Sequence, residues 1–222
     1  MRLNLLFRDL GACCEEASSL AAGCKRGVLK ILLWRGAQPR GYRPRTTKVE
    51  RLLIRDELPA LPPSAWSQGV RVMRSPVLLS QQPRLAGIKH LNRLEQVLAS
   101  QDWPRGVAEA IQCDASGSPI GGTRCNLFWV SRGALYTPEL SLCGVAGMMR
   151  QKVLEMAQAL RIDWKIGRWS WRDFELSDEA FLTNSLIGIW PLRAIDRRRW
   201  RVPGPVTSRL ITALAHPLIL SA

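Results

Sequence analysis

One stretch carries most of the information in this chain: Leu85-Ala86-Gly87-Ile88-Lys89-His90-Leu91-Asn92-Arg93-Leu94-Glu95-Gln96-Val97-Leu98. Its leucines at 91, 94 and 98 recur at helical spacing with polar residues between them, which predicts a helix just after Lys89. Two interpretations of Lys89 are open. It is a solvated cation at a helix start, or it is an amine in a partly desolvated pocket, where a lowered pKa makes it a nucleophile toward a carbonyl.

The composition is that of a globular protein with an unusual charge. Of the 222 residues, 46% are hydrophobic and 23% are charged, which suffices for one good core or two modest ones. The net charge is +14, so the surface attracts anions, either nucleic acid or a phosphate cofactor with an anionic substrate. The cations are scattered, and the one dense run, between Arg197 and Arg201, lies among tryptophans and prolines. We therefore do not expect specific nucleic-acid binding.

The cysteines and histidines predict no metal site, since the six cysteines form no C-x-x-C pair and only two histidines are present. Reduced thiols in a cytoplasmic protein are the simple interpretation. The apolar run over residues 3–7 is too short for a signal peptide, and no stretch is long enough to span a bilayer. We expect a cytoplasmic protein with no membrane association.

The periodicity predicts helices and strands in two domains. We expect helices over 9–26 and 206–215, one after Gly147, and a helix start at Ser177-Asp178-Glu179. Strands are expected over 28–34, 51–55, 70–79, 107–114, 121–130 and 162–172, and the turn at 115–118 makes a β-hairpin. Three prolines between Pro59 and Pro63 prevent regular structure, so we place the boundary there, with domains 1–63 and 64–222.

Four motifs in order support a resemblance to a known family. Residues 87–96, G-I-K-H-L-N-R-L-E-Q, resemble the cofactor-lysine segment of the aminodeoxychorismate lyases. These are fold-type IV pyridoxal-phosphate enzymes, related to branched-chain and D-amino-acid aminotransferases. The other motifs are G-G-T-R-C-N-L-F at 121–128, L-C-G-V-A-G-M-M-R at 142–150 and F-L-T-N-S-L-I-G-I-W-P-L at 181–192. The resemblance implies an α+β, two-domain fold-type IV enzyme like D-amino-acid aminotransferase.

The resemblance also implies an activity and a site. It implies a lyase that converts 4-amino-4-deoxychorismate into 4-aminobenzoate and pyruvate in folate biosynthesis, acting as a homodimer. Lys89 would be the catalytic residue, forming an imine with pyridoxal 5'-phosphate and then moving protons as base and acid. The implied cofactor-binding residues are Lys89, Asn126, Val145, Ala146, Gly147, Thr183, Asn184 and Ser185. The loop over 35–42 implies substrate-binding residues, since an arginine fork suits carboxylates: Arg35, Arg40 and Tyr42.

The chain departs from the family in two places. Gly121 stands where the family has a glutamate that pairs with the ring nitrogen of the cofactor and keeps it protonated. A glutamate restored at 121 should recover activity if the backbone angles suit a side chain. The chain also begins downstream of the family's opening strands and of a phosphate-binding arginine, so we expect a truncated first domain. These departures keep open a catalytically impaired homologue or a non-catalytic binding protein on the same fold.

Two further alternatives remain open. The first is a class IV aminotransferase of branched-chain or D-amino acids, which would exchange an amino group with a keto acid instead of releasing pyruvate. The second is a basic nucleic-acid binder, whose affinity would fall steeply with rising salt.

Overall fold

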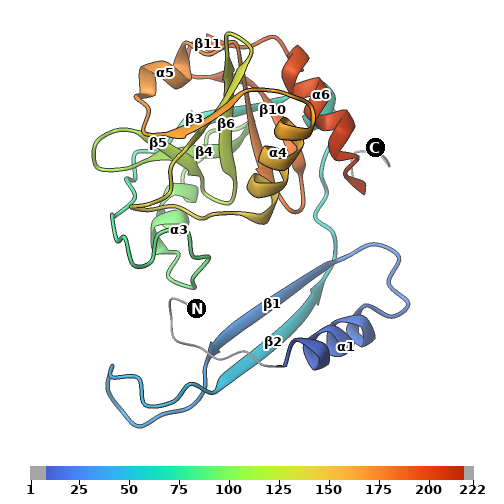
Figure 1. Ribbon diagram of the computed structural model, residues 1–222, viewed down its shortest axis with the longest axis vertical. Helices are drawn as coiled ribbons and strands as arrows, with labels where there is room; N and C mark the ends of the chain where they lie inside the picture. The colour runs from blue at the N-terminus through green and yellow to red at the C-terminus, as the bar shows by residue number, and fades with distance from the viewer. Residues whose placement is uncertain (1–8, 218–222) are drawn as a thin grey trace. The chain divides into compact units, whose positions relative to one another are not determined.

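A proline-rich segment divides the chain into two units. The computed structural model describes residues 9–217, with one unit up to Ala60 and the other from Leu61 onward (Figure 1). The division falls inside the segment where the prolines place the domain boundary. Each unit has a sheet of its own.

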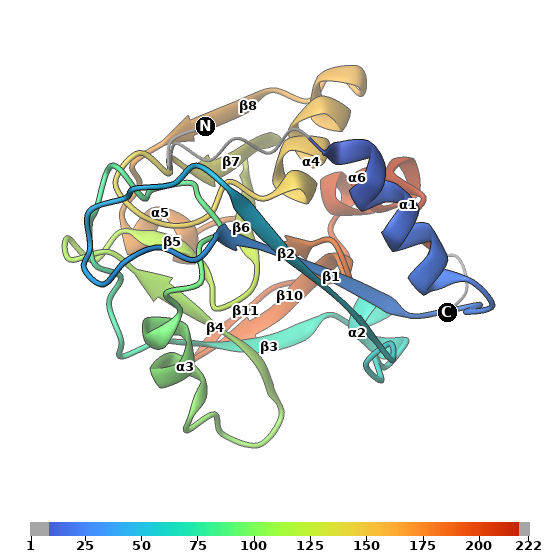
Figure 2. The same ribbon diagram turned by 90° about the horizontal axis from the view of Figure 1, so that it is seen from below.

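The first unit is a hairpin with one helix along it (Figure 2). Helix α1 (Leu10–Ala21) precedes strands β1 (Val28–Arg35) and β2 (Val49–Asp56), which pair antiparallel along their whole length. Arg51 of β2 donates a hydrogen bond to the Glu16 carboxylate of α1 at 2.7 Å. Ile31 and Leu52 are about half exposed, at 46% and 45%. Because a two-stranded hairpin is marginally stable alone, this unit needs apolar contacts beyond its own.

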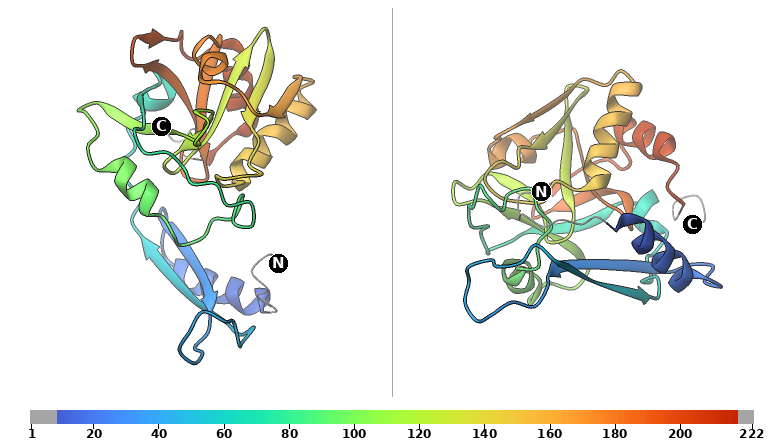
Figure 3. Two further views of the ribbon diagram at one scale, coloured as in Figure 1. Left: turned by 90° about the vertical axis from the view of Figure 1, so that its left-hand side faces the viewer. Right: turned by 60° about the horizontal axis from the view of Figure 1, so that its bottom comes forward.

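The second unit is a strongly curled sheet (Figure 3). Its strands are β3 (Val70–Arg74), β4 (Val107–Cys113), β5 (Pro119–Gly122), β6 (Asn126–Ser131), β7 (Ala134–Pro138), β8 (Trp164–Gly167), β9 (Glu179–Asn184), β10 (Gly188–Ile195) and β11 (Arg198–Arg199). The hydrogen-bonded order is β11-β10-β3-β4-β5-β6-β7-β8, and β9 pairs with both β10 and β6. This double pairing closes β3, β4, β5, β6, β9 and β10 into a barrel.

Both faces of the barrel wall are buried. Along β6, Leu127 and Trp129 belong to one apolar cluster, whereas Phe128 and Val130 belong to another. The second cluster also holds residues of α4 (Met148–Ala159) and α6 (Pro205–Leu214), which cover the outer face (Figure 1). Because successive side chains of a strand point to opposite faces, a strand buried on both sides reads as a continuous apolar run, as this one does.

The mixture of helices and strands confirms the expected α+β class. Most expected elements are present, but the predicted helix start at 177–179 is wrong. The helix there is α5 (Trp171–Glu175), and Glu179 opens β9 instead. A capping box explains the earlier start, because Ser170 and Asp173 each accept the other's backbone N–H.

Three expected strands are shorter in the structure, and the one expected over 162–172 is only β8, with its last two residues already in α5. The strand expected over 70–79 ends at Arg74, and the one expected over 121–130 is divided into β5 and β6. The division occurs because the buried Glu109 carboxylate accepts hydrogen bonds from both the N–H (3.0 Å) and the hydroxyl (2.6 Å) of Thr123, which bends the chain there. A short helix, α2 (Ser64–Ser67), follows the prolines.

Candidate functional site

The Lys89 segment is held against the glycine-bearing loop that precedes α4. Gly87 and Val145 form a parallel bridge, in which the Gly87 N–H donates to Gly144 O at 3.0 Å and the Ala146 N–H donates to Gly87 O at 3.1 Å. Gly87 has a φ of +80°, a conformation that favours glycine over every other residue. Lys89 follows two residues later, with an exposed side chain. The structure therefore brings two of the four motifs together, with the lysine accessible beside them.

Helix α3 (Leu94–Ser100) follows Lys89 and directs polar side chains toward the rest of the second unit. Glu95 accepts the Ser80 N–H at 2.8 Å, and the Gln96 amide donates to Gln112 at 3.4 Å. The apolar side chains of this segment are exposed, between 54% and 76%: Leu91, Leu94, Val97 and Leu98. The leucine periodicity thus marks an outward face and not a core face.

Paired residues form a row across the barrel wall. Gln112 of β4 lies opposite Gly121 of β5, which lies opposite Asn126 of β6, which lies opposite Thr183 of β9. Directly paired residues point to the same face of a sheet. This is the outer face, because Phe128 and Phe181, two residues further along their strands, belong to the cluster under α4 and α6.

Asn126 connects this row to the loop before α4. Its amide donates to Val145 O at 2.7 Å, and a side chain at Gly147 would collide with its carbonyl oxygen. The loop can approach this closely only because residue 147 is a glycine. Three of the predicted cofactor-binding positions, Asn126, Val145 and Gly147, are therefore in contact with one another.

The start of α4 offers an anion site one residue later than expected. The N–H groups of Ala146 and Gly147 donate to Gly87 O and Val145 O, so they are engaged within the loop. Gly147 is the N-cap and has no side chain to cap the helix, and the first turn carries no acidic residue. The N–H groups of Met148 and Met149 therefore have no partner within the helix and lie at its positive end. Sequence reasoning missed these two residues because an anion contacts their backbone and not their side chains.

The Thr183-Asn184-Ser185 turn is largely occupied by its own hydrogen bonds. The buried Thr183 hydroxyl donates to Gly188 O at 2.6 Å. The Asn184 side chain accepts the N–H groups of residues 186 and 187 and donates to Arg124 O. Ser185 is exposed. Of the three predicted binding residues, Ser185 presents its side chain outward, while the other two shape the turn.

The predicted substrate-binding residues all lie in the first unit. Arg35 ends β1 and donates to the Thr46 carbonyl, while Arg40 and Tyr42 are exposed in the loop between β1 and β2. Their role in substrate binding remains a prediction.

Several buried polar side-chain atoms lack a hydrogen-bond partner, and one of them belongs to the residue after Lys89. Within residues 9–217, three of the six such side-chain atoms are His90 Nδ1, Gln96 Oε1 and Gln112 Nε2. Burial, and then the charge of Arg93, lowers the pKa of His90, so its imidazole is neutral near pH 7. An aldehyde that bears a phosphate needs an amine that can form an imine and a site for an anion, which Lys89 and the start of α4 offer. The residues present therefore fit pyridoxal phosphate.

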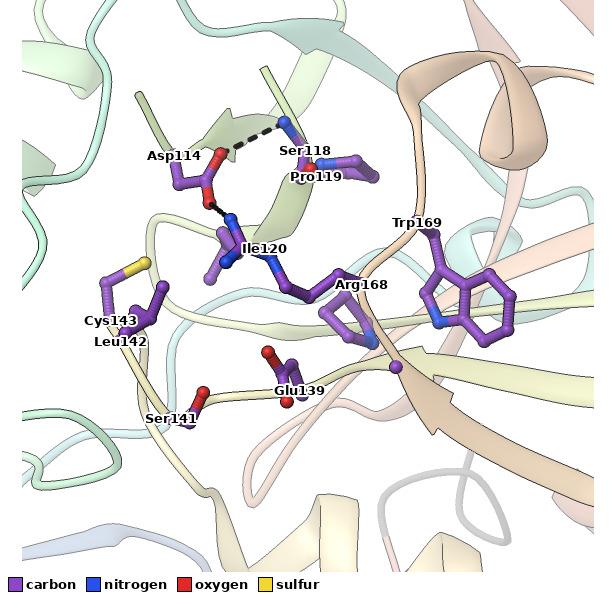
Figure 4. A pocket seen from close by; sticks show the side chains of 12 residues that line it. Asp114, Ser118, Pro119, Ile120, Glu139, Ser141, Leu142, Cys143, Arg168 and Trp169 are labelled. Atoms are coloured by element: carbon purple, nitrogen blue, oxygen red, sulfur yellow. Dashed lines mark hydrogen bonds and ion pairs between the residues drawn. The ribbon is translucent and has the colours of Figure 1, made fainter. Parts of the chain in front are cut away.

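A pocket lies at the turn of the β4–β5 hairpin (Figure 4). Its Asp114 carboxylate is already bonded to Arg168 at 3.3 Å and to Ser116 and Ser118. Burial raises the pKa of the Cys143 thiol to about 11, so this cysteine is not a nucleophile at neutral pH. Among residues 9–217, no group of three or more histidine, cysteine and acidic side chains could hold a metal ion.

None of the helices described between residues 9 and 217 is long and apolar enough to cross a bilayer.

The chain is similar in sequence and structure to known lyases and aminotransferases. A family model described as amino-transferase class IV matches residues 11–195. Aminodeoxychorismate lyase of Vibrio harveyi is 33% identical over 208 residues, which are 92% of this chain and 76% of that protein. The crystal structure of 4-amino-4-deoxychorismate lyase from Pseudomonas aeruginosa has a TM-score of 0.92 at 40% identity, covering 98% of this chain and 81% of that one. The probable branched-chain-amino-acid aminotransferase of Thermotoga maritima is 33% identical over 116 residues, which are 51% of this chain and 42% of that protein.

Proposed function

The chain belongs to the aminotransferase class IV family, and we propose that it is a pyridoxal-phosphate-dependent lyase that converts 4-amino-4-deoxychorismate into 4-aminobenzoate and pyruvate. The expected resemblance to the aminodeoxychorismate lyases is confirmed, because lyase relatives share 33% to 40% of residues over most of the chain. The observation that carries the proposal is the bridge between the Lys89 segment and the loop that opens α4. The proposal places the reaction in the cytoplasm, on the route to folate.

The chain's own residues have distinct tasks in this reaction. When bound, the cofactor supplies an electron sink for the bond that breaks beside the substrate amine. Lys89 would be bound covalently to the aldehyde carbon of the cofactor. Once released, its amine would move a proton at the substrate carbon next to the substrate amine. The N–H groups of Met148 and Met149 would bind the phosphate, and Asn126 keeps their loop in place.

The substrate would be a small dicarboxylate. A net charge of +14 draws anions toward the protein at long range. Arg35, Arg40 and Tyr42 carry groups that suit carboxylates, and Arg40 and Tyr42 are exposed. The lyase is favoured over an aminotransferase because the lyase relative covers 92% of the chain, whereas the aminotransferase relative covers 51%.

We also propose that the protein is a homodimer. Exposed apolar side chains support a covered surface: Ile31 and Leu52 on the hairpin, and Leu91, Leu94, Val97 and Leu98 around α3. Light scattering should show a dimer at micromolar concentration, and Leu94→Lys should shift it toward monomer. A wild-type protein that stays monomeric at that concentration would contradict this assembly.

The test of the function compares Lys89→Ala with the wild-type protein. Given the cofactor, the wild-type protein should gain a visible absorption band, and borohydride reduction followed by peptide mass spectrometry should place the cofactor on residue 89. Lys152→Ala, which removes an exposed lysine of α4, is the matched control and should retain the band. A band that survives in Lys89→Ala would refute the assignment. Release of pyruvate, against amino-group exchange with a keto acid, distinguishes the lyase from the aminotransferase.

A further inference from the structure

We propose that Arg93 is a positioning residue, which holds the backbone on both sides of Lys89 and so sets the lysine amine for its reaction with an aldehyde. The inference rests on the proposed function, in which Lys89 binds the cofactor. Arg93 acts through Lys89 and is not itself a catalytic residue.

The guanidinium of Arg93 bonds to the carbonyl groups on either side of the lysine. Its Nε–H donates to His90 O at 2.9 Å, and one of its terminal N–H groups donates to Ile88 O at 3.2 Å. Because the guanidinium is planar and its N–H groups form a rigid fork, one side chain fixes the separation of these two carbonyls. Lys89 is the residue between them. Its backbone is therefore restrained from both ends.

The surroundings of Arg93 show that these two bonds are its main contacts. The residue is half-buried, and among residues 9–217 no carboxylate forms an ion pair with it. Burial lowers the pKa of Arg93, whereas the charge of Glu95 raises it, and the guanidinium stays charged at neutral pH. Removing a cation from water is unfavourable unless hydrogen bonds replace its hydration. The two carbonyls supply those bonds, so the guanidinium and the Lys89 backbone fix one another.

The chain before Lys89 has anchors of its own. The Gly87 N–H donates to Gly144 O at 3.0 Å, and the Ile88 N–H donates to Leu85 O at 3.0 Å. These bonds restrain the backbone as far as residue 88, and Arg93 extends the restraint past the lysine. The exposed lysine side chain is long, so a mobile backbone would enlarge the volume through which its amine moves. A restrained backbone keeps the amine near the position from which it attacks a bound aldehyde.

The first experiment needs no cofactor. Amide hydrogen exchange of the 222-residue chain is followed by mass spectrometry in the wild-type protein and in Arg93→Met, which keeps an unbranched side chain but loses both hydrogen bonds. We expect peptides over residues 87–92 to exchange about tenfold faster in the variant, with the barrel strands unchanged. Arg84→Met removes an exposed arginine from the same segment and should match the wild-type protein. Unchanged exchange over 87–92, or faster exchange throughout the second unit, would refute the inference.

The second experiment follows the visible absorption band after pyridoxal phosphate is added. In Arg93→Met the band should appear about tenfold more slowly, and its circular dichroism should weaken because the bound cofactor is less fixed in orientation. Arg93→Lys keeps the positive charge but has no planar fork, so it should resemble Arg93→Met. Borohydride reduction and peptide mass spectrometry identify the lysine that carries the cofactor in each variant. If Arg93→Lys regains the wild-type rate with the cofactor on residue 89, charge alone suffices and the inference is refuted.

The outcomes separate this inference from the proposed function. If the wild-type band forms on Lys89 and Arg93→Met matches it in rate and circular dichroism, the inference is refuted and the function stands. If Arg93→Met does not fold, Arg93→Lys decides by the same measurements. If the wild-type protein does not take up the cofactor at Lys89, both fail.

Discussion

A methyl group added at Gly121 should destabilise the second unit. The φ of Gly121 lies outside the left-handed region, so its backbone angles suit a side chain. A Cβ there would nevertheless lie 2.8 Å from the carbonyl oxygen of Cys125. That oxygen accepts the Gly122 N–H at 2.8 Å, which fixes the turn between β5 and β6. Gly121→Ala must therefore move backbone and not a flexible side chain.

The expected cost follows from this contact. Overpacking against fixed atoms typically destabilises by about 1–3 kcal/mol. For a protein of this size, that lowers the unfolding temperature by roughly 2–12 °C. Differential scanning calorimetry of the 222-residue chain measures the shift in the transition of the second unit.

A control separates the contact from the substitution itself. Gly11 lies within α1, and a Cβ there meets no atom within 4 Å. Gly11→Ala should therefore stabilise the first unit by about 0.5–1 kcal/mol, through helix propensity. If Gly121→Ala is as stable as the wild-type protein, the steric argument is wrong. If it holds, Gly121→Glu meets the same steric conflict before it can aid catalysis.

Three further outcomes follow from buried groups. Glu179→Ala removes a buried carboxylate that accepts two N–H groups at the start of α6, at 2.8 and 3.0 Å. Chemical denaturation should therefore show that the free energy of unfolding falls by about 3–5 kcal/mol. A fall of less than about 1 kcal/mol would contradict the capping role of Glu179. Alkylation near pH 8 should label the exposed Cys14 rapidly and Cys143 slowly, because burial raises the pKa of Cys143 to about 11, and equal rates would contradict that burial. Burial lowers the pKa of His90, so the unfolded chain binds its proton more readily, and stability is lost as the pH falls below the ordinary value of about 6.5. His90→Gln should reduce that acid-side loss in denaturant titrations at pH 5 to 7, and an unchanged pH profile would exclude His90 as its source.

The sequence alone was sufficient for the family, the class of fold and most elements. Lys89 could be singled out because four motifs occur in order, and the hairpin over 107–130 because its strands and turn are adjacent in the chain. The positions of Asn126 and Gly147 were also named from their motifs, and the structure places them in contact. The hairpin could be predicted because its residues are close together in sequence, whereas the roles of Lys89, Asn126 and Gly147 stay predictions.

Tertiary structure decided what depends on pairing between distant segments. The leucines around α3 fit a helix, but their periodicity could not show that they face outward, because polar contacts from Glu95 and Gln96 orient the helix. The closure of the barrel by β9, which pairs with two strands at once, has no local signature. The position of Gln112 opposite Gly121 has no local sequence signature either. Only the register of β4 against β5 places it opposite Gly121, because register is set by the packing of the whole sheet and not by the residues of either strand.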